Sequence, residues 1–349
     1  GDEFTILCED LTSDSDAETL AARFSAALGE PYIIDGVEVM ITASIGVAFA
    51  DHHRTAARSI EDADAAMYKA KERGRNRIEI FDERTRDATH SRLTNQTELR
   101  HALDAGEFVV HYQPIRSLDE LNATGVEALV RRRAADGSLI GPERFIGLAE
   151  ETGLIIPLGS FVLTEACQQA QLWRGDRKHE SLGVSVNVSA RQISHGGLVD
   201  VVMQALGDSE LPAEALTLEI TESTLMGMTE SPTTLRQLRD LGVAIAIDDF
   251  GTGYSSLDYL RRLPIDVLKL DQVFLQDVAT HHATEAIVSS TVKLANTLGL
   301  DLVAEGIETN EQLDLLRHLG CPQGQGFHLG RPADPRVLDF DAPAWIHAA

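Results

Sequence analysis

Apolar and polar positions follow two successive patterns along the chain. Up to about residue 83, the extended segment EFTILCED precedes the helical segment DAETLAARFSAAL and the β-rich segment YIIDGVEVMITASIGVAFA, whose DG dipeptide is typical of a hairpin turn. A further helix has Ala63, Ala66, Met67 and Ala70 at helical spacing and ends at Gly74, before a short strand. These patterns predict a small α/β unit.

From about residue 105, short β-rich segments end in a polar group and are followed by amphipathic helices. The segments are FVVHYQPI, GVEALVRR, GVSVNVSA, LTLEITES, VAIAIDDFGTG, VLKLD, LVAEGIET and GQGFHLGRP. Counted from Asn187, the next polar strand ends are Glu219, Asp248, Lys269, Glu305 and Gln325, at separations of 32, 29, 21, 36 and 20 residues. Such spacing fits one strand plus one helix, and so many units favour a closed parallel barrel over an open sheet.

The fold class predicted from both patterns is α/β, with a (β/α)8 TIM-like barrel preceded by a smaller α/β domain. We expect the first domain over residues 1–83, a charged helical linker over 84–100 and the barrel over 101–345. In a barrel of this kind the strand ends meet at one mouth, so the polar strand ends should face each other across one pocket.

The charge of the chain limits its partners. The formal net charge is −25, from 55 acidic residues against 30 lysines and arginines, which argues against a nucleic-acid groove and a polybasic membrane patch. No apolar run reaches the roughly 18 residues of a membrane span, and no leader opens the chain. We therefore expect a cytoplasmic segment, whose full-length parent could still be anchored in a membrane.

Five oxygen-bearing side chains at the strand ends suggest a metal site: Glu127, Asn187, Glu219, Asp248 and Asp249. Oxygen donors without histidine or cysteine favour Mg²⁺ or Mn²⁺ over zinc. The vicinal pair Asp248 and Asp249 could bridge two ions, as in phosphodiester hydrolysis. The alternative interpretation is that each acid is a solvated loop carboxylate, or that the Asp pair caps a turn.

Two further strand ends suggest chemistry beside the metals. Lys269, with apolar neighbours in VLKLD, could hold the attacking water or a phosphate oxygen, unless it is a surface lysine. Glu305 in VAEGIET could take a proton from that water or hold a metal, unless it is an acid that stabilises a helix N-terminus.

The motifs of this region resemble those of the EAL family of cyclic di-GMP phosphodiesterases over about residues 95–340. The resemblance is carried in order by YQPI at 112–115, EAL at 127–129, FIGLAEETGLI at 145–155, NVS at 187–189, LEITES at 218–223, IDDFGTGYSSL at 247–257, LKLD at 268–271, AEGIET at 304–309 and GQGFHLGRP at 324–332. It implies hydrolysis of this second messenger to linear pGpG by a water attack assisted by two metal ions.

The resemblance also implies a role for each matching residue. Glu127, Asn187, Glu219 and Asp248 would bind the first ion, and Asp248 and Asp249 would serve the second. Catalytic roles would fall to Glu305, Lys269 and Glu222, the last by holding the DDFGTGYSS loop. Substrate-contacting positions would be Gln113, Arg131, Gln325 and Glu308, the last near the second metal.

The first unit resembles the second half of a GGDEF diguanylate cyclase domain, through GDEF at 1–4, ITASIGVA at 41–48 and AAMYKAKERGRNR at 65–77. By that resemblance, Asp2 and Glu3 would be acids near metal, and Lys71 and Arg75 would contact phosphates. Because the upstream half of such a domain would supply a strand, a metal ligand and guanine contacts, we expect no cyclase activity from this chain.

Other functions remain open at this point. The chain could be a receptor that binds cyclic di-GMP without turnover, or a barrel lyase with other metal-carboxylate chemistry. The complete set of acids with Lys269 disfavours the receptor, and the order of the motifs disfavours the lyase. Members of the EAL family commonly pair through the barrel, so the resemblance also implies a homodimer.

Overall fold

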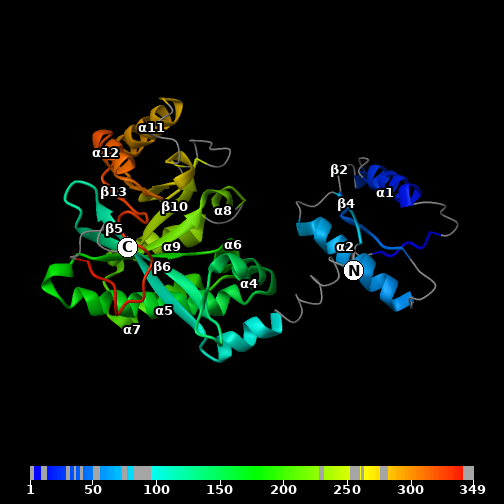
Figure 1. Ribbon diagram of the computed structural model, residues 1–349, viewed down its shortest axis with the longest axis horizontal. Coiled ribbons are helices and arrows are strands. Elements are labelled where there is room, and N and C mark those ends of the chain that lie inside the picture. The colour runs from blue at the N-terminus through cyan, green and yellow to red at the C-terminus, as the bar shows by residue number, and fades with distance from the viewer. Residues whose placement is uncertain are drawn as a thin grey trace. The chain divides into compact units, whose positions relative to one another are not determined.

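The structure, a computed structural model, describes residues 4–8, 14–28, 32–34, 37–39, 42–49, 56–72, 77–81, 96–227, 232–251, 260, 263–275 and 282–340. The chain divides into two units, residues 1–98 and 99–349 (Figure 1). The predicted sites at Asp2, Glu3 and Arg75, and the predicted helix end at Gly74, lie outside the described residues.

The described residues of the first unit form two helices and two small sheets. Its elements are α1 (Asp14–Leu28), β1 (Tyr32–Ile34), β2 (Val37–Val39), β3 (Ile45–Val47), α2 (Ala56–Glu72) and β4 (Ile78–Ile80). The antiparallel pairing of β1 with β2 confirms the predicted hairpin, and β3 pairs in parallel with β4. The extended segment predicted at the start is not a strand over residues 4–8, because no described strand pairs with it.

Helix α2 lies directly on strand β3. Ala66 and Ala70 are fully buried on the predicted face of the helix, and Lys71 lies in its last turn. A Cβ atom built at Gly46 would lie 2.1 Å from the Ala63 carbonyl oxygen and from the Met67 nitrogen. Glycine is therefore needed at this position for the helix to approach the strand so closely.

The second unit is a closed barrel with helices around it (Figure 1). The strands are β5 (Phe108–Ser117), β6 (Ala123–Arg133), β8 (Gly183–Asn187), β9 (Leu216–Thr221), β10 (Ala244–Phe250), β11 (Val267–Leu270), β12 (Asp301–Ala304) and β13 (Gln323–Gly324). Each pairs with its neighbour, and β5 pairs with both β6 and β13, which closes the sheet. The short β7 (Leu139–Ile140) pairs antiparallel with the last two residues of β6.

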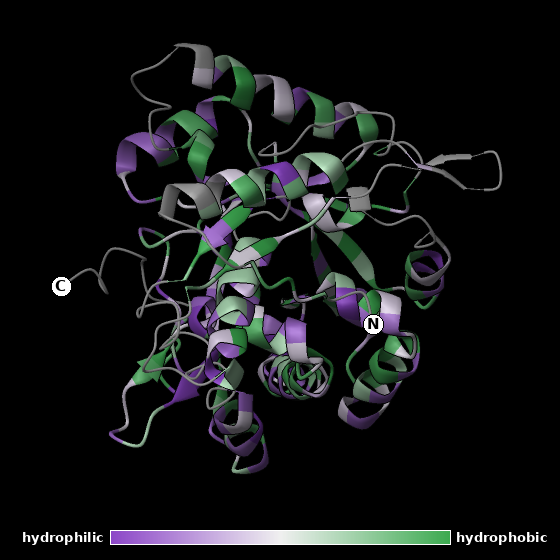
Figure 2. Cartoon of the chain, turned by 90° about the vertical axis from the view of Figure 1, so that its right-hand side faces the viewer, coloured by the Kyte–Doolittle hydropathy of each residue, from purple (hydrophilic) through white to green (hydrophobic). Residues whose placement is uncertain are grey.

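The helices described from residue 96 onward include a segment over residues 96–104 and the elements α4 (Ile146–Thr152), α5 (Ile155–Arg174), α6 (Ala190–His195), α7 (Leu198–Ser209), α8 (Glu222–Gly227), α9 (Pro232–Asp240), α11 (His282–Leu298) and α12 (Asn310–His318). They carry bands of hydrophobic and hydrophilic residues (Figure 2). In α9, Leu235 and Leu238 are fully buried, and Gly242 follows with a φ of 96°, a conformation that favours glycine beyond a helix end.

The predicted barrel is confirmed, with one departure from a fully parallel sheet. Strand β5 runs antiparallel to β6 and to β13, whereas the other barrel strands pair in parallel. The reason is the short connection between β5 and β6, which is too short for a crossover helix and forms a hairpin instead. The polar ends of the parallel strands still meet at one mouth.

Candidate active site

The predicted site residues lie on the strands of the barrel or directly after them. Glu127 is on β6, Asn187 ends β8, Glu219 is on β9, Asp248 and Asp249 are on β10, and Lys269 is on β11. Glu305 directly follows β12, and Gln325 directly follows β13. Residues from seven strands, which lie far apart in the sequence, therefore meet at one mouth of the barrel.

A β-bulge orients the pair on β10. Ile247 pairs with Leu268 and Phe250 pairs with Leu270, so Asp248 and Asp249 together stand opposite the single residue Lys269. Asp249 has a φ of 54°, in the left-handed region that aspartate tolerates better than most residues. In a regular strand two successive side chains would point to opposite faces, and the bulge lets both carboxylates face the mouth.

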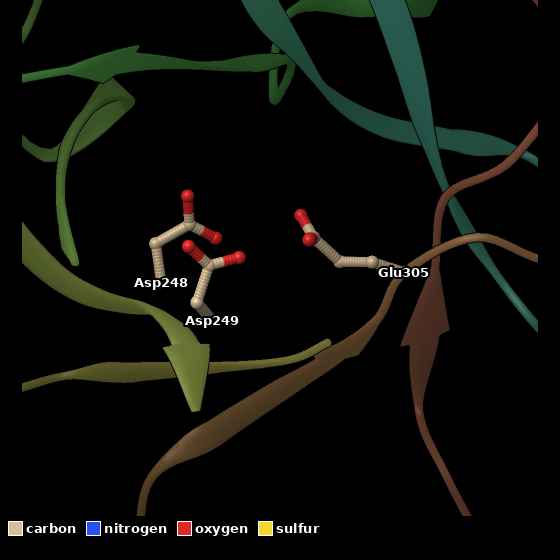
Figure 3. Close-up of side chains that lie close together, drawn as sticks. All are labelled: Asp248, Asp249 and Glu305. Atoms are coloured by element: carbon tan, nitrogen blue, oxygen red, sulfur yellow. The ribbon is translucent and has the colours of Figure 1, made fainter. Parts of the chain in front are cut away.

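Asp248, Asp249 and Glu305 form a group that could hold a metal ion. One carboxylate oxygen of each lies within 4.8 Å of the others. Figure 3 shows Glu305, which follows β12, extending toward the two aspartates of β10. This group combines the residue predicted as a base with two predicted metal ligands.

Lys269 lies among the carboxylates and is 1% exposed. Its Nζ atom is 2.6 Å from Glu219 Oε2, 2.6 Å from Glu305 Oε1, 3.3 Å from Asp248 Oδ1 and 3.5 Å from Glu127 Oε2. Lys269 is thus a buried cation inside the barrel, and the alternative interpretation as a surface lysine is wrong.

The charges of the group shift its pKa values. Burial alone would lower the pKa of Lys269, but Glu127, Glu219 and the other carboxylates raise it well above its usual range. Burial raises the pKa of Glu305 to about 8. The nearby Lys269 lowers this pKa, whereas Asp248 raises it further. Burial and the neighbouring Asp248 raise the pKa of Asp249 to about 6. Glu305 and Asp249 therefore take up protons more readily than ordinary surface acids.

Amide groups hold Glu127 in place. Asn187 donates from Nδ2 to Glu127 Oε1 at 2.7 Å, and Gln325 donates from Nε2 to Glu127 Oε2 at 2.5 Å. Gln325 also donates to Gln113 Oε1 at 3.0 Å, and Gln113 stands directly opposite Glu127 across β5 and β6. Burial would raise the pKa of Glu127, but Lys269 and these amides bring it below its usual value.

A cavity of about 220 Å³ opens at this mouth. It is lined by Gln113, Glu127, Leu129, Asp248, Asp249, Asp271, Gln272, Glu305, Gly306, Glu308, Gln325, Gly326 and Phe327. Of the positions predicted to contact a substrate, Gln113, Gln325 and Glu308 lie in its wall. Arg131 is not among the lining residues, although it follows Glu127 and Leu129 at alternate positions of β6.

Asp271 is a site residue that the sequence reasoning missed. Its carboxylate lies at the cavity and acts on Asp249, whose pKa it helps to raise. The same side chain accepts a hydrogen bond from Val273 N at 2.7 Å and so caps the short 3-10 helix η4 (Gln272–Phe274). Its position two residues after Lys269, on the same face by strand alternation, is the signal that could have found it.

Glu222 contacts Gly251, which belongs to the DDFGTGYSS segment that Glu222 is predicted to hold. It is 1% exposed, and its Oε2 atom accepts a hydrogen bond from Gly251 N at 2.8 Å. Gly251 immediately follows β10 and has a φ of 97°. Glu222 therefore fixes the backbone at the end of the strand that carries Asp248 and Asp249.

The donor set fits a divalent cation. Its members are carboxylates, which suit Mg²⁺ or Mn²⁺. Asp248 Oδ1 is buried and, among the described residues, makes no hydrogen bond, although Lys269 lies near it. An oxygen in that position can still accept a metal ion, so the acidic cluster could bind metal.

Residues 96–332 match the family model of the EAL domain. The chain belongs to the EAL domain family. In this EAL protein, residues 1–77 also match the model of the GGDEF domain of diguanylate cyclases. Within the described residues, no helix is long and apolar enough to cross a membrane.

Curated relatives of this EAL protein include two from Pseudomonas aeruginosa. The bifunctional diguanylate cyclase/cyclic di-GMP phosphodiesterase MucR is 45% identical over 340 residues, which cover 97% of this chain and 49% of MucR. The cyclic di-GMP phosphodiesterase NbdA is 40% identical over 341 residues, covering 97% of this chain and 43% of NbdA. The chain thus spans about half the length of the curated relatives that it matches, or less.

Solved structures resemble the barrel of this EAL protein. The phosphodiesterase of MucR in complex with c-di-GMP is 47% identical and has a TM-score of 0.65, covering 69% of this chain and 98% of that one. The EAL enzyme Bd1971, bound to cAMP and cyclic di-GMP, is 32% identical with a TM-score of 0.68, covering 71% of this chain and 68% of that one.

Proposed function

We propose that this chain hydrolyses cyclic di-GMP to linear pGpG in the cavity of its EAL barrel, with Mg²⁺ or Mn²⁺ as cofactor. The observation that carries the proposal is the convergence of Asp248, Asp249 and Glu305 at the cavity, with their oxygens within 4.8 Å of one another. Relatives with this domain are named as phosphodiesterases of the same dinucleotide. The net charge of −25 adds support, because an acidic protein needs cations at the site to hold an anionic substrate.

The proposed ligands form two overlapping sets. Glu127, Asn187, Glu219 and Asp248 would hold one ion, and Asp248 with Asp249 would hold the other. Divalent ions bound there would activate a water molecule and offset the charge that develops on the phosphate. Asp271, at 2.7 Å from Val273 N and beside Asp249, is fixed in a place from which it would support the second set.

The protein's own groups would move the proton and hold the reacting atoms. Water attacks phosphorus, the bond from phosphorus to the ribose 3′ oxygen breaks, and one proton of the water must leave while the 3′ oxygen gains one. Glu305, whose pKa is raised to about 8, is suited to take up the proton from water. Lys269 would hold the water or a phosphate oxygen, and Glu222 would keep the end of β10 in place.

Further residues of the cavity would bind the dinucleotide. Gln113, Gln325 and Glu308 line the cavity and offer amide and carboxylate groups to ribose, phosphate or base. Gln325 Oε1 is buried and makes no hydrogen bond among the described residues, so it is available to a donor. Arg131 would reach the substrate from the outer part of β6.

The direct test is incubation of the full chain with cyclic di-GMP, followed by chromatography of the nucleotides. With Mg²⁺ or Mn²⁺ we expect linear pGpG to accumulate, and with EDTA we expect none. A protein that retains the dinucleotide on a filter but yields no pGpG with either ion would be a receptor, and the proposed hydrolysis would be wrong.

Substitution of proposed ligands tests the metal assignment. Loss of an outer-shell partner of a metal typically costs about 10–100-fold, so Glu127→Ala or Asp248→Asn should lower turnover by more than about 100-fold. The fold should survive, because Lys269 keeps three of its four carboxylate partners in either variant. Circular dichroism and steady-state rates measure both effects, and undiminished turnover in either variant would refute the assignment. Asp314→Asn, at an exposed position of α12, is the matched control.

We also propose that the chain forms a homodimer through the barrel. This proposal rests on the behaviour expected of the family. Light scattering of the purified chain over a range of concentrations tests it, and a constant monomer mass would contradict it.

A further inference from the structure

Lys269 is the cation that the described structure places among four carboxylates. Glu127, Glu219, Asp248 and Glu305 all lie within 3.5 Å of its Nζ atom. In the described part of the chain, no other lysine or arginine forms an ion pair with these four acids. One positive charge therefore faces up to four negative charges.

The position of this ammonium group is fixed by the barrel. Lys269 lies in the middle of β11, between Leu268 and Leu270, which are 0% and 1% exposed. Strand alternation points these two leucines away from the side on which Lys269 lies. Because β11 is paired with β10 and β12 on its two sides, Lys269 cannot turn outward without breaking the sheet.

Burial makes the charge balance important for folding. Glu219 is 1% exposed and Glu127 is 6% exposed, so water screens their repulsion weakly. Removal of one partner of a buried ion pair leaves a charge without compensation, which is strongly destabilising. The same carboxylates are the proposed ligands of a divalent ion, which would supply positive charge to the same oxygens.

We propose that Lys269 is the internal counter-ion that holds these carboxylates together, so that its ammonium and divalent metal are interchangeable sources of positive charge in folding the barrel. The inference rests on the metal-binding part of the proposed function. It assigns Lys269 a role in the stability of the site that is separate from any contact with substrate. Its consequence is that loss of the lysine makes the fold depend on metal.

The test compares thermal midpoints of the full chain in EDTA and in Mg²⁺, for the wild type and for Lys269→Met. Methionine has a similar length and no charge, and Lys293→Met, at an exposed position of α11, is the matched control. In EDTA we expect Lys269→Met to lower the midpoint by roughly 6–20 °C. The increase in thermal midpoint that Mg²⁺ causes should be several-fold larger for this variant than for the wild type or for Lys293→Met.

Each outcome bears on the inference. If Mg²⁺ raises the midpoints of the wild type and of Lys269→Met equally, the inference is wrong while metal binding stands. If Mg²⁺ leaves the wild type unchanged, the metal-binding part of the proposed function fails first, and the inference with it. Neither readout requires turnover of a substrate.

A second variant covers the case in which Lys269→Met does not fold. The double variant Glu219→Gln with Lys269→Met removes one negative charge together with the positive one. Recovery of a folded protein, with a midpoint above that of Lys269→Met, supports the role in charge compensation. A double variant that folds no better than Lys269→Met in either EDTA or Mg²⁺ would mean that the lysine acts through packing, which would overturn the inference.

Discussion

The left-handed backbone conformation of Asp249 is locally unfavourable, but it helps to place the carboxylate in the site. Its φ of 54° places it in a region that non-glycine residues seldom occupy, and the surrounding strands must hold it there. In exchange, two successive carboxylates face one cavity beside Lys269. Backbone strain of this kind is often found at functional sites.

Metal binding should depend on pH because protons compete for the same oxygens. The pKa of Glu305 is raised to about 8 and that of Asp249 to about 6, and each carboxyl must lose its proton to bind a divalent ion. As the pH rises from about 6 to about 8, the affinity for Mg²⁺ should therefore increase, with release of protons on binding. Calorimetric titrations in buffers of different ionisation enthalpy measure both effects, and an affinity that stays constant over this range would contradict the assignment.

If cyclic di-GMP binds in the cavity as proposed, Phe327 is expected to stack on one of its bases. Its side chain lines the cavity and is 46% exposed, and Arg331 Cζ lies 4.3 Å from the centroid of its ring. Base stacking on an aromatic ring contributes about 1–3 kcal/mol, so Phe327→Ala should raise the KM for cyclic di-GMP by roughly 5–100-fold with a smaller change in kcat.

Two controls separate stacking from general loss of structure. Phe327→Trp keeps an aromatic ring and should retain a KM close to that of the wild type. Val337→Ala removes an exposed apolar side chain outside the cavity lining and should leave both kinetic constants unchanged. Steady-state kinetics on the four proteins measure the effect, and an unchanged KM in Phe327→Ala would exclude the stacking role.

At the scale of elements, the strands were predictable and their directions were only partly so. Each predicted β-rich segment overlaps a barrel strand, the last one only at Gly324, because alternating or continuous apolar runs next to amphipathic helices indicate burial. The hairpin of β5 and β6 was missed because the spacing of strands along the sequence does not show whether neighbouring strands run parallel or antiparallel. The bulge at Asp248 and Asp249 was missed because it depends on pairing with β11, which the local sequence does not specify.

In the site, too, the local sequence identifies single residues, whereas the contacts between them depend on the fold. The sequence identifies Glu127, Glu219 and Lys269 as polar residues in apolar strands, and the closed barrel brings them together. Asp271 was missed because an aspartate that begins a turn looks like an ordinary helix cap, and the structure shows that it serves as one as well. Which carboxylates contact Lys269 depends on strand register, which emerges only in the folded sheet.

The turn after β13 is predicted to tolerate no side chain at Gly326. A Cβ atom there would lie 2.2 Å from the Ile307 nitrogen and carbonyl oxygen, so Gly326→Ala must displace backbone between Gln325 and Phe327. Overpacking of this kind typically costs about 1–3 kcal/mol of unfolding free energy, and turnover should fall as Gln325 moves.

Gly147 provides the matched control for this substitution. It lies in α4, and a Cβ atom there meets nothing within 4 Å, so Gly147→Ala should be neutral or stabilising by up to about 1 kcal/mol. Urea titrations of both variants measure the difference. Equal stability of Gly326→Ala and Gly147→Ala would contradict the described contact between the turn and Ile307.

At the scale of the whole molecule, the candidate site belongs to one unit. Every residue that lines the cavity lies in residues 99–349, and this unit has its own closed sheet and core. A protein made of residues 96–349 should therefore fold and hydrolyse cyclic di-GMP in Mg²⁺ at a measurable rate. Product analysis by chromatography tests this, and a folded fragment with no turnover beside an active full chain would show that the first unit is required.

The most direct test of the central claim is anomalous diffraction from crystals of the protein soaked in Mn²⁺. The account predicts anomalous density next to the carboxylate oxygens of Asp248 and Asp249, with Glu305 or Glu127 as a further neighbour, and its loss in Asp248→Asn. Well-ordered crystals with no anomalous density at these residues, or with Mn²⁺ bound elsewhere in the barrel, would contradict it.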